Sequence, residues 1–235
     1  MKVVSWNCQM AFRKKVELIL VYKPDILVVP ECEHPSKIVF PEGNEPTDVL
    51  WYGDNFNKGL GVFSFNEYRL ELLNCHNPEI KTILPITVTT NSSSFTMFAL
   101  WTGRGYIDQV WKAIRCYEGL ITTSGTLIVG DFNSNTIWDK KHRPDTHSSM
   151  VQELSLKGIA STYHHYNKLQ HGQEEHPTLS MFRHRDKPYH IDYCFATEDF
   201  LDTLKSVEVG TYDQWHQYSD HTPLIISFNS EFLQG

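Results

Sequence analysis

The stretch SDHTPLIISF, residues 219–228, places a carboxylate and an imidazole side by side immediately before an apolar run. Adjacent side chains of an extended chain point to opposite faces, so Asp220 and His221 are poorly placed to be partners of each other. Each of them therefore requires a counterpart from another part of the chain. The segments that supply these counterparts decide how the chain must fold.

Short apolar runs recur throughout the sequence. They are rich in Val, Ile, Phe and Tyr and are bounded by polar clusters, which is typical of strands. The eight predicted strands are KVVSW (2–6), DILVVP (25–30), LGVFSF (60–65), ILPITVTT (83–90), FTMFALW (95–101), TLIVG (126–130), IDYCFA (191–196) and PLIISF (223–228).

Three segments between these strands have helical character. They are residues 11–23, 107–121 and 148–158. In the second segment the apolar residues Val110, Ile114, Tyr117 and Ile121 fall on one face, and the third segment ends in Gly158, as helices often do. Strands outnumber helices and the connections are mixed, so we predict an α/β (α+β) protein with two packed sheets. No repeat or linker divides residues 1–235, and a single domain is expected.

Composition points to a soluble cytoplasmic protein. No stretch approaches the roughly 20 apolar residues of a membrane span. The N-terminus, MKVVSWNCQM, has one Lys and then becomes polar, unlike a secretory signal. The five cysteines are odd in number and contain no C-x-x-C, which favours free thiols in a reducing compartment.

The net charge of −7 argues against a protein that binds nucleic acid mainly by covering phosphates with Lys and Arg. It does not exclude a nuclease, because a bound cation and local basic loops can serve one phosphate. The basic runs are Arg13 to Lys15, Lys140 to Arg143 and Arg183 to Lys187, and such runs are more typical of a solvated face than of a contact surface.

Histidines are concentrated between residues 160 and 190. They are His164, His165, His171, His176, His184 and His190. No Cys and no regular His-x-x-x-His pair completes a set of four zinc ligands there. A polar loop over a site is therefore favoured over a structural zinc site.

Polar residues follow or begin several of the predicted strands, where a scaffold can hold them rigidly. They are Asn7, Glu31, Asp131, Asn133, Asp192, Asp220 and His221. Any one of them alone is more typical of a cap or a turn. Their repetition indicates a site.

The ordered series WNC, PECE, GLGVFS, GDFNSN, HIDYCF and SDHTPL resembles the endonuclease/exonuclease/phosphatase superfamily, and it extends from Asn7 to His221. This resemblance implies a four-layer sandwich, with two mainly antiparallel mixed sheets face to face and helices outside. It also implies phosphoester hydrolysis assisted by a divalent metal ion, Mg²⁺ or Mn²⁺.

The resemblance assigns a role to each motif residue. Glu31 would be the principal metal ligand, with Asn7 and Asp220 nearby, an oxygen set that suits a hard cation. Asp131 would activate the attacking water, and Asn133 would donate hydrogen bonds to the phosphoryl oxygens.

The question posed by Asp220 and His221 is answered by the same resemblance. Asp220 turns toward the metal and Glu31, while His221 faces the scissile phosphate and is oriented by Asp192 of HIDYCF. We therefore predict a hydrogen bond of roughly 2.6–3.2 Å between an imidazole nitrogen of His221 and the Asp192 carboxylate.

Two positions depart from the superfamily pattern. Trp101 stands where many members carry a His or Tyr that touches the phosphate, so this contact is expected from Arg104 or Tyr106, or is lost. His190 stands where relatives often carry Arg, and would carry less charge at neutral pH.

The leading hypothesis is a monomeric nuclease or phosphodiesterase whose substrate is a phosphoester, with DNA or RNA as the first candidates. A phosphatase or phosphodiesterase that acts on a small molecule or a lipid headgroup is the alternative. A non-catalytic phosphate-binding module is disfavoured, because Glu31, Asp131 and His221 are all retained.

Overall fold

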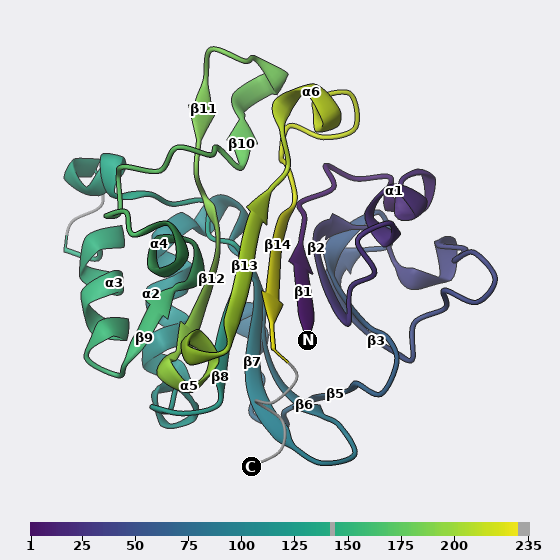
Figure 1. Ribbon diagram of the computed structural model, residues 1–235, viewed down its shortest axis with the longest axis horizontal. Coiled ribbons are helices and arrows are strands. Elements are labelled where there is room, and N and C mark those ends of the chain that lie inside the picture. Colours follow the sequence, from purple (N-terminus) through teal and green to yellow (C-terminus); the bar gives the residue numbers. More distant parts are fainter. Residues whose placement is uncertain (142–143, 230–235) are drawn as a thin grey trace.

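Two six-stranded sheets pack face to face, with helices on the outside of both (Figure 1). The computed structural model describes residues 1–141 and 144–229. The first sheet has the spatial order β13 (Leu204–Val209), β14 (Leu224–Phe228), β1 (Lys2–Ser5), β2 (Ile26–Cys32), β4 (Lys58–Ser64) and β3 (Asp48–Asn55). The second has the order β5 (Arg69–Leu72), β6 (Ile83–Thr89), β7 (Ser94–Trp101), β8 (Thr126–Asp131), β12 (Asp192–Thr197) and β9 (Ile159–Ser161).

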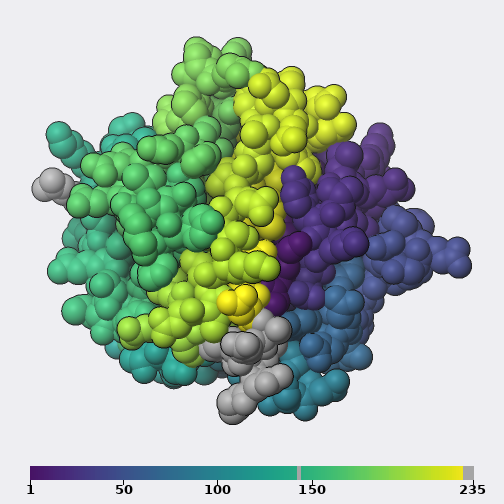
Figure 2. Space-filling view, in the orientation of Figure 1, coloured from purple at the N-terminus to yellow at the C-terminus, as the bar shows by residue number. Residues whose placement is uncertain are grey.

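Each sheet is mixed but mainly antiparallel. The pairs β1–β2 and β7–β8 are parallel, and the other strand pairs of the two sheets are antiparallel. The strands β1 and β14 pair along four residues of each, and in Figure 2 the purple residues near the N-terminus lie beside the yellow segment. The predicted architecture of two mainly antiparallel sheets with outer helices is confirmed.

Apolar side chains form three layers of core. Between the sheets, residues such as Val28 and Val62 pack against residues such as Met97 and Leu127. The outer face of the second sheet packs against α2 (Tyr106–Cys116) and α3 (His147–Ser155). The outer face of the first sheet is covered by α1 (Val16–Leu20) and by Trp215 of α6 (Tyr212–Trp215). The remaining α-helices are α4 (Thr162–Asn167) and α5 (Glu198–Asp202).

The eight predicted strands are all present, within about two residues of their expected ends. The predicted helix over 11–23 is wrong in extent, because it consists of a 3₁₀ turn (Phe12–Lys14) followed by α1. Ala11 has left-handed backbone angles, with φ of 52°, and Lys15 also departs from helical angles, so a continuous helix cannot form. The helices over 107–121 and 148–158 are confirmed as α2 and α3 with shorter C-terminal ends.

A small hairpin, β10 (Leu179–Ser180) with β11 (Pro188–Tyr189), stands at the end of the sheets where β8 ends and β12 begins (Figure 1). The five cysteines are free thiols, as predicted. Within residues 1–141 and 144–229, no helix is long and apolar enough to cross a membrane.

Gly130 permits a close approach between β7 and β8. Its φ of 145° lies outside the range that L side chains ordinarily adopt, and a Cβ there would meet the Leu100 carbonyl oxygen at 1.9 Å. The residue that follows is Asp131, whose register partner on β7 is Trp101. A side chain at position 130 would therefore separate the two strands that present Asp131 and Trp101.

We predict that Gly130→Ala lowers the free energy of unfolding by at least about 3 kcal/mol, because backbone strain and a backbone clash add together. Urea denaturation followed by circular dichroism measures this loss. Gly119→Ala is the matched control, since a Cβ at position 119 has no neighbour within 4 Å, and it should stay within about 0.5 kcal/mol of wild type. Equal stability of the two variants would contradict the assignment of strain to Gly130.

Candidate active site

Polar side chains from both sheets line one cavity of about 420 Å³ at the ends of the strands. Its walls include the predicted residues Asn7, Glu31, Trp101, Arg104, Tyr106, Asp131, Asn133, Asp220 and His221. Asp192 lies behind His221 and is 1% exposed. The structure therefore brings together all ten of the residues singled out from the sequence.

Asp131 is the most enclosed carboxylate of this group, with no exposed surface. Asn7 Nδ2 donates to its Oδ2 at 2.9 Å, and Asn133 donates its backbone N–H to Oδ1 at 2.9 Å and its side-chain amide to Oδ2 at 3.0 Å. Asn133 reaches this position with a left-handed φ of 47°, a conformation that Asn tolerates better than most residues. Asn7 comes from the first sheet and Asn133 from the second, so Asp131 is held across the two sheets.

The predicted hydrogen bond between His221 and Asp192 is confirmed, with 2.8 Å between Nδ1 and Oδ2. The other ring nitrogen, Nε2, lies 4.0 Å from Asp131 Oδ2. Ser219 fixes the segment by accepting from the His221 backbone N–H at 3.0 Å and donating to the Asn7 carbonyl at 2.7 Å. Ser219 and His221 of the SDH motif are thus fixed by partners from distant parts of the chain, Asn7 and Asp192.

Burial and the neighbouring charges together shift the pKa values of Asp131 and His221. Burial, with the nearby Asp192 carboxylate adding to it, raises the pKa of Asp131 to about 7. Burial alone would lower the pKa of His221, but the Asp192 and Asp131 carboxylates outweigh it and raise that pKa to about 10. His221 is therefore an imidazolium at neutral pH, placed between two carboxylates.

Glu31, Asn7 and Asp220, which line the same cavity, form a donor set that fits a hard cation. Glu31 interrupts the register of β2 against β4 at a bulge, has a left-handed φ of 62°, and lines the cavity with Asn7 and Asp220. Carboxylate and amide oxygens are the donors that Mg²⁺ and Mn²⁺ prefer. Glu31 Oε2 already attracts a cation, since Lys58 Nζ lies 3.0 Å from it. The predicted ligand set of Glu31, Asp220 and Asn7 therefore suits such an ion.

Asp131, Asp192 and His221 also lie close enough together to be considered as metal ligands. One observation argues against this interpretation. The Asp192 and Asp131 carboxylates raise the pKa of His221, so its ring is protonated, whereas a metal ligand requires a neutral imidazole. We interpret these three residues as a proton-bearing group.

Lys58 is a member of the site that the sequence analysis missed. Besides its contact with Glu31, its ammonium lies 5.0 Å from the centroid of the Trp101 ring, in a cation–π arrangement. The only signal was its position directly before the GLGVFS motif. Lys58 is thus a positive group beside Trp101. Trp101 itself stands at the position for which the superfamily pattern predicts a His or Tyr.

His190 lacks the charge of the arginine that relatives often carry. It is 3% exposed, its Nδ1 donates to the His176 carbonyl at 2.7 Å, and burial lowers its pKa to about 4. Among the residues that the structure describes, its Nε2 has no hydrogen-bond partner. The expectation of a neutral group at this position is supported.

Solved structures with the same architecture cover nearly the whole chain. An AP endonuclease from Archaeoglobus fulgidus has a TM-score of 0.72 and 15% identity, and the match covers 97% of this chain and 99% of that one. The endonuclease domain of TRAS1, a telomere-specific non-LTR retrotransposon, has a TM-score of 0.67 and 18% identity over 100% of this chain and 99% of that one. The 3'-5' exonuclease NExo from Neisseria meningitidis has a TM-score of 0.67 and 18% identity over 97% and 100%.

The chain therefore has the same fold as these nucleases and as an endonuclease/exonuclease/phosphatase from Beutenbergia cavernae (TM-score 0.65, 15% identity over 96% of this chain and 70% of that one), which is the fold that the motif series predicted. No protein-family model matches the sequence, and no curated protein matches it. At these identities the solved structures establish the fold, and the chemistry has to be argued from the residues of this chain.

We predict that His221 stays protonated well above the ordinary histidine pKa of about 6.5. Because its pKa is raised to about 10, both ring nitrogens should carry protons at pH 8 in metal-free protein, when an ordinary imidazole has lost one. Nitrogen-15 NMR of the imidazoles, recorded in chelator, measures this. Asp192→Asn should bring the loss of the proton down toward neutral pH, and a neutral His221 at pH 8 in the wild type would refute the charge assignment.

Proposed function

We propose that this protein is a divalent-metal-dependent phosphoester hydrolase of the nuclease or phosphodiesterase type. The observation that carries the proposal is the convergence of Asn7, Glu31, Asp220, Asn133 and His221 on one cavity around the buried Asp131. Glu31, Asp220 and Asn7 would hold the metal ion. When bound, the ion supplies positive charge that attracts the phosphate and stabilises charge that develops on it.

The other residues are arranged for proton transfer and charge stabilisation. Asp131, with its pKa near neutrality, is suited to accept a proton from an attacking water. The Asn133 amide has a second N–H that can be donated to a phosphoryl oxygen. The His221 imidazolium, oriented by Asp192, supplies a positively charged donor for the same oxygens.

A nucleic acid is the substrate class that we favour. The structures of similar fold are named as an endonuclease domain, an AP endonuclease, an exonuclease and a 3' phosphatase bound to a product DNA hairpin. A second cavity of about 510 Å³ adjoins the first, sharing Tyr106, Asn133, Leu179 and Met181 with it. Trp138 and Tyr189 line this second cavity with ring centroids 5.1 Å apart, and aromatic faces of this kind can stack on bases.

One observation favours the alternative of a small-molecule or lipid-headgroup phosphate. The basic runs that could grip a nucleic acid are largely engaged within the protein. Arg13 pairs with Glu33, Lys15 donates to three backbone carbonyls, and Arg185 pairs with Asp213. Of the run from Lys140 to Arg143, His142 and Arg143 lie outside the described residues. A substrate that needs few phosphate contacts is consistent with these pairings.

We predict that hydrolysis of bis-p-nitrophenyl phosphate requires Mg²⁺ or Mn²⁺ and stops in excess chelator. Glu31→Gln should lower turnover by at least about 100-fold, because the variant loses the carboxylate charge that holds the ion. The exposed Glu71→Gln is the control and should keep wild-type turnover. Undiminished hydrolysis in chelator would exclude the proposal. A panel of p-nitrophenyl phosphate, single- and double-stranded DNA, RNA and inositol phosphates then separates the two substrate classes.

We further predict that Asp131→Asn reduces turnover by at least about 1,000-fold while the Michaelis constant changes by no more than about 3-fold. The reason is that proton abstraction stabilises the transition state rather than the bound substrate. Steady-state kinetics at saturating metal measures both quantities, with the exposed Asp108→Asn as control. Turnover near that of the wild type would place the general base elsewhere.

A further inference from the structure

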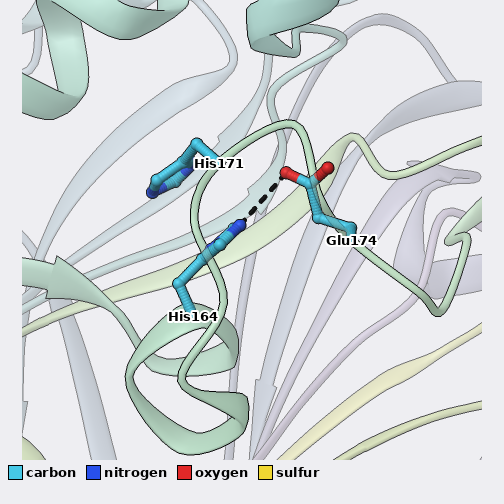
Figure 3. A group of neighbouring side chains, drawn as sticks. All are labelled: His164, His171 and Glu174. Atoms are coloured by element: carbon cyan, nitrogen blue, oxygen red, sulfur yellow. Dashed lines mark hydrogen bonds and ion pairs between the residues drawn. The ribbon is translucent and has the colours of Figure 1, made fainter.

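Glu174 and Glu31 are both paired with a basic side chain, but their surroundings differ. Glu174 is 6% exposed and lies 3.1 Å from His164, and the ring of His171 stacks on that of His164 with centroids 3.6 Å apart (Figure 3). Stacked rings cannot direct their nitrogens at a common ion, so this group is a packed polar cluster. The pair of Glu31 with Lys58 opens on the cavity of the candidate active site instead.

Lys58 connects the predicted metal ligand to the wall formed by Trp101. Its ammonium lies 3.0 Å from Glu31 Oε2 and 5.0 Å from the centroid of the Trp101 ring, and all three side chains line the same cavity. The Lys58 side chain is 36% exposed, so its ammonium is accessible to a molecule that enters the cavity. The motif series assigns no role to this residue.

The backbone holds Lys58 beside Glu31. In β2, Cys32 follows the bulged residue Glu31. Its partner in β4 is Gly59, the residue after Lys58. Trp51 fixes this pair, because its Nε1 donates to the Cys32 carbonyl at 3.0 Å and a Cβ on Gly59 would meet its ring at 2.6 Å. The two side chains are therefore carried by strands whose register cannot slip.

The Trp101 ring gives the ammonium a second partner. Trp101 is the last residue of β7 and the register partner of Asp131 in β8. An indole face attracts a cation without taking up its hydrogen-bond donors. A lysine that only neutralised Glu31 would not need such a ring. The contact instead holds the ammonium against the strand pair that carries Asp131.

A phosphate that enters this cavity meets several acidic groups. The carboxyl groups of Glu31, Asp131 and Asp220 line it, and an ionised carboxylate repels a phosphate. A divalent ion held by Glu31 and Asp220 would offset their charge, and the His221 imidazolium faces Asp131. An ammonium has three N–H donors, so Lys58 can contact a phosphoryl oxygen from its place beside the indole.

Given the phosphoester hydrolysis proposed above, on which this inference rests, we propose that Lys58 binds the substrate by donating to a non-bridging oxygen of the scissile phosphate. It supplies the contact that superfamily members obtain from a His or Tyr at the position of Trp101. In metal-free protein the ammonium is the counter-ion of Glu31. Once Glu31 binds a divalent ion, the two cations repel each other, and Trp101 is the partner that keeps Lys58 at the phosphate.

Mn²⁺ binding tests the contact with Glu31 without any turnover. Lys58→Met keeps the length of the side chain and removes its charge, so the ion no longer competes with an ammonium for the carboxylate. We expect the Mn²⁺ Kd of the full-length protein, measured by electron paramagnetic resonance, to fall by about 3–10-fold, whereas the exposed Lys205→Met stays at the wild-type value. An unchanged or higher Kd in Lys58→Met would overturn the proposal. Wild-type protein that binds no Mn²⁺ would refute the metal site of the proposed function.

Steady-state kinetics with bis-p-nitrophenyl phosphate at saturating Mn²⁺ tests the contact with the phosphate. Lys58→Met should lower kcat/KM by at least about 10-fold, because the substrate loses a charge-assisted hydrogen bond. Lys58→Arg keeps the charge and the contact with the indole, and it should stay within about 3-fold of wild type. Wild-type kcat/KM in Lys58→Met would overturn the proposal, whereas an inactive wild type would refute the proposed hydrolysis. Lys58→Gln repeats both measurements with a polar side chain, and circular dichroism checks that each variant is folded.

A double-mutant cycle tests whether Trp101 acts through Lys58. Trp101→Leu removes the ring, and it should lower kcat/KM by at least about 5-fold in the wild-type background but by no more than about 2-fold in Lys58→Met. The reason is that the ring supports the ammonium, which the second background lacks. Equal losses in the two backgrounds would show that the ring acts on the substrate by itself and would overturn its assignment as the support of Lys58.

Discussion

Two buried carboxylates opposite each other on neighbouring strands are the constraint that organises this protein. Asp131 at the end of β8 and Asp192 at the start of β12 are register partners in an antiparallel pair, where side chains share a face and like charges destabilise the sheet. Burial adds a further cost to each charge. The arrangement is tolerable because His221 places a cation between them and Asn7 donates to Asp131.

Both compensating groups come from the other sheet. Asn7 follows β1 and His221 precedes β14, and these two strands are paired in the first sheet. The polar contacts at the strand ends therefore link the two sheets across the same interface that the apolar core fills farther down. Left-handed backbone at Glu31 and Asn133, and the close approach at Gly130, are concentrated at this end of the molecule. Strain of this kind persists where surrounding structure holds it in place, and its position coincides with the candidate active site.

Much of this arrangement could be predicted from the sequence, for a physical reason. Of the strands that carry the site, β8 and β12 are buried along their whole length and β1, β2, β7 and β14 along most of it. Their apolar runs are therefore unambiguous, and the polar residues at their ends are conspicuous. The sheet strands that were not predicted lie at the edges: β3 and β13 in the first sheet, β5 and β9 in the second. The half-exposed residues of β3 and β13 give no strong apolar pattern, β5 and β9 have only four and three residues, and the hairpin strands β10 and β11 have two each. Lys58 was missed because its role depends on contacts with Glu31 and Trp101 from two other strands, which sequence order does not reveal.

The histidines of this protein show how local carboxylates decide the charge of a buried imidazole. His221 is enclosed with the carboxylates of Asp192 and Asp131, which raise its pKa to about 10 although burial alone would lower it. His147 and His171 share the single carboxylate of Glu174 with other imidazoles, so burial and mutual repulsion prevail and their pKa values fall. The GDFNSN loop lies between these two environments, because Asp131 and Asn133 face the first while Ser134 and Asn135 contact the second. A change in either half of this loop therefore acts on a different protonation state, a cationic imidazole on one side and neutral imidazoles on the other.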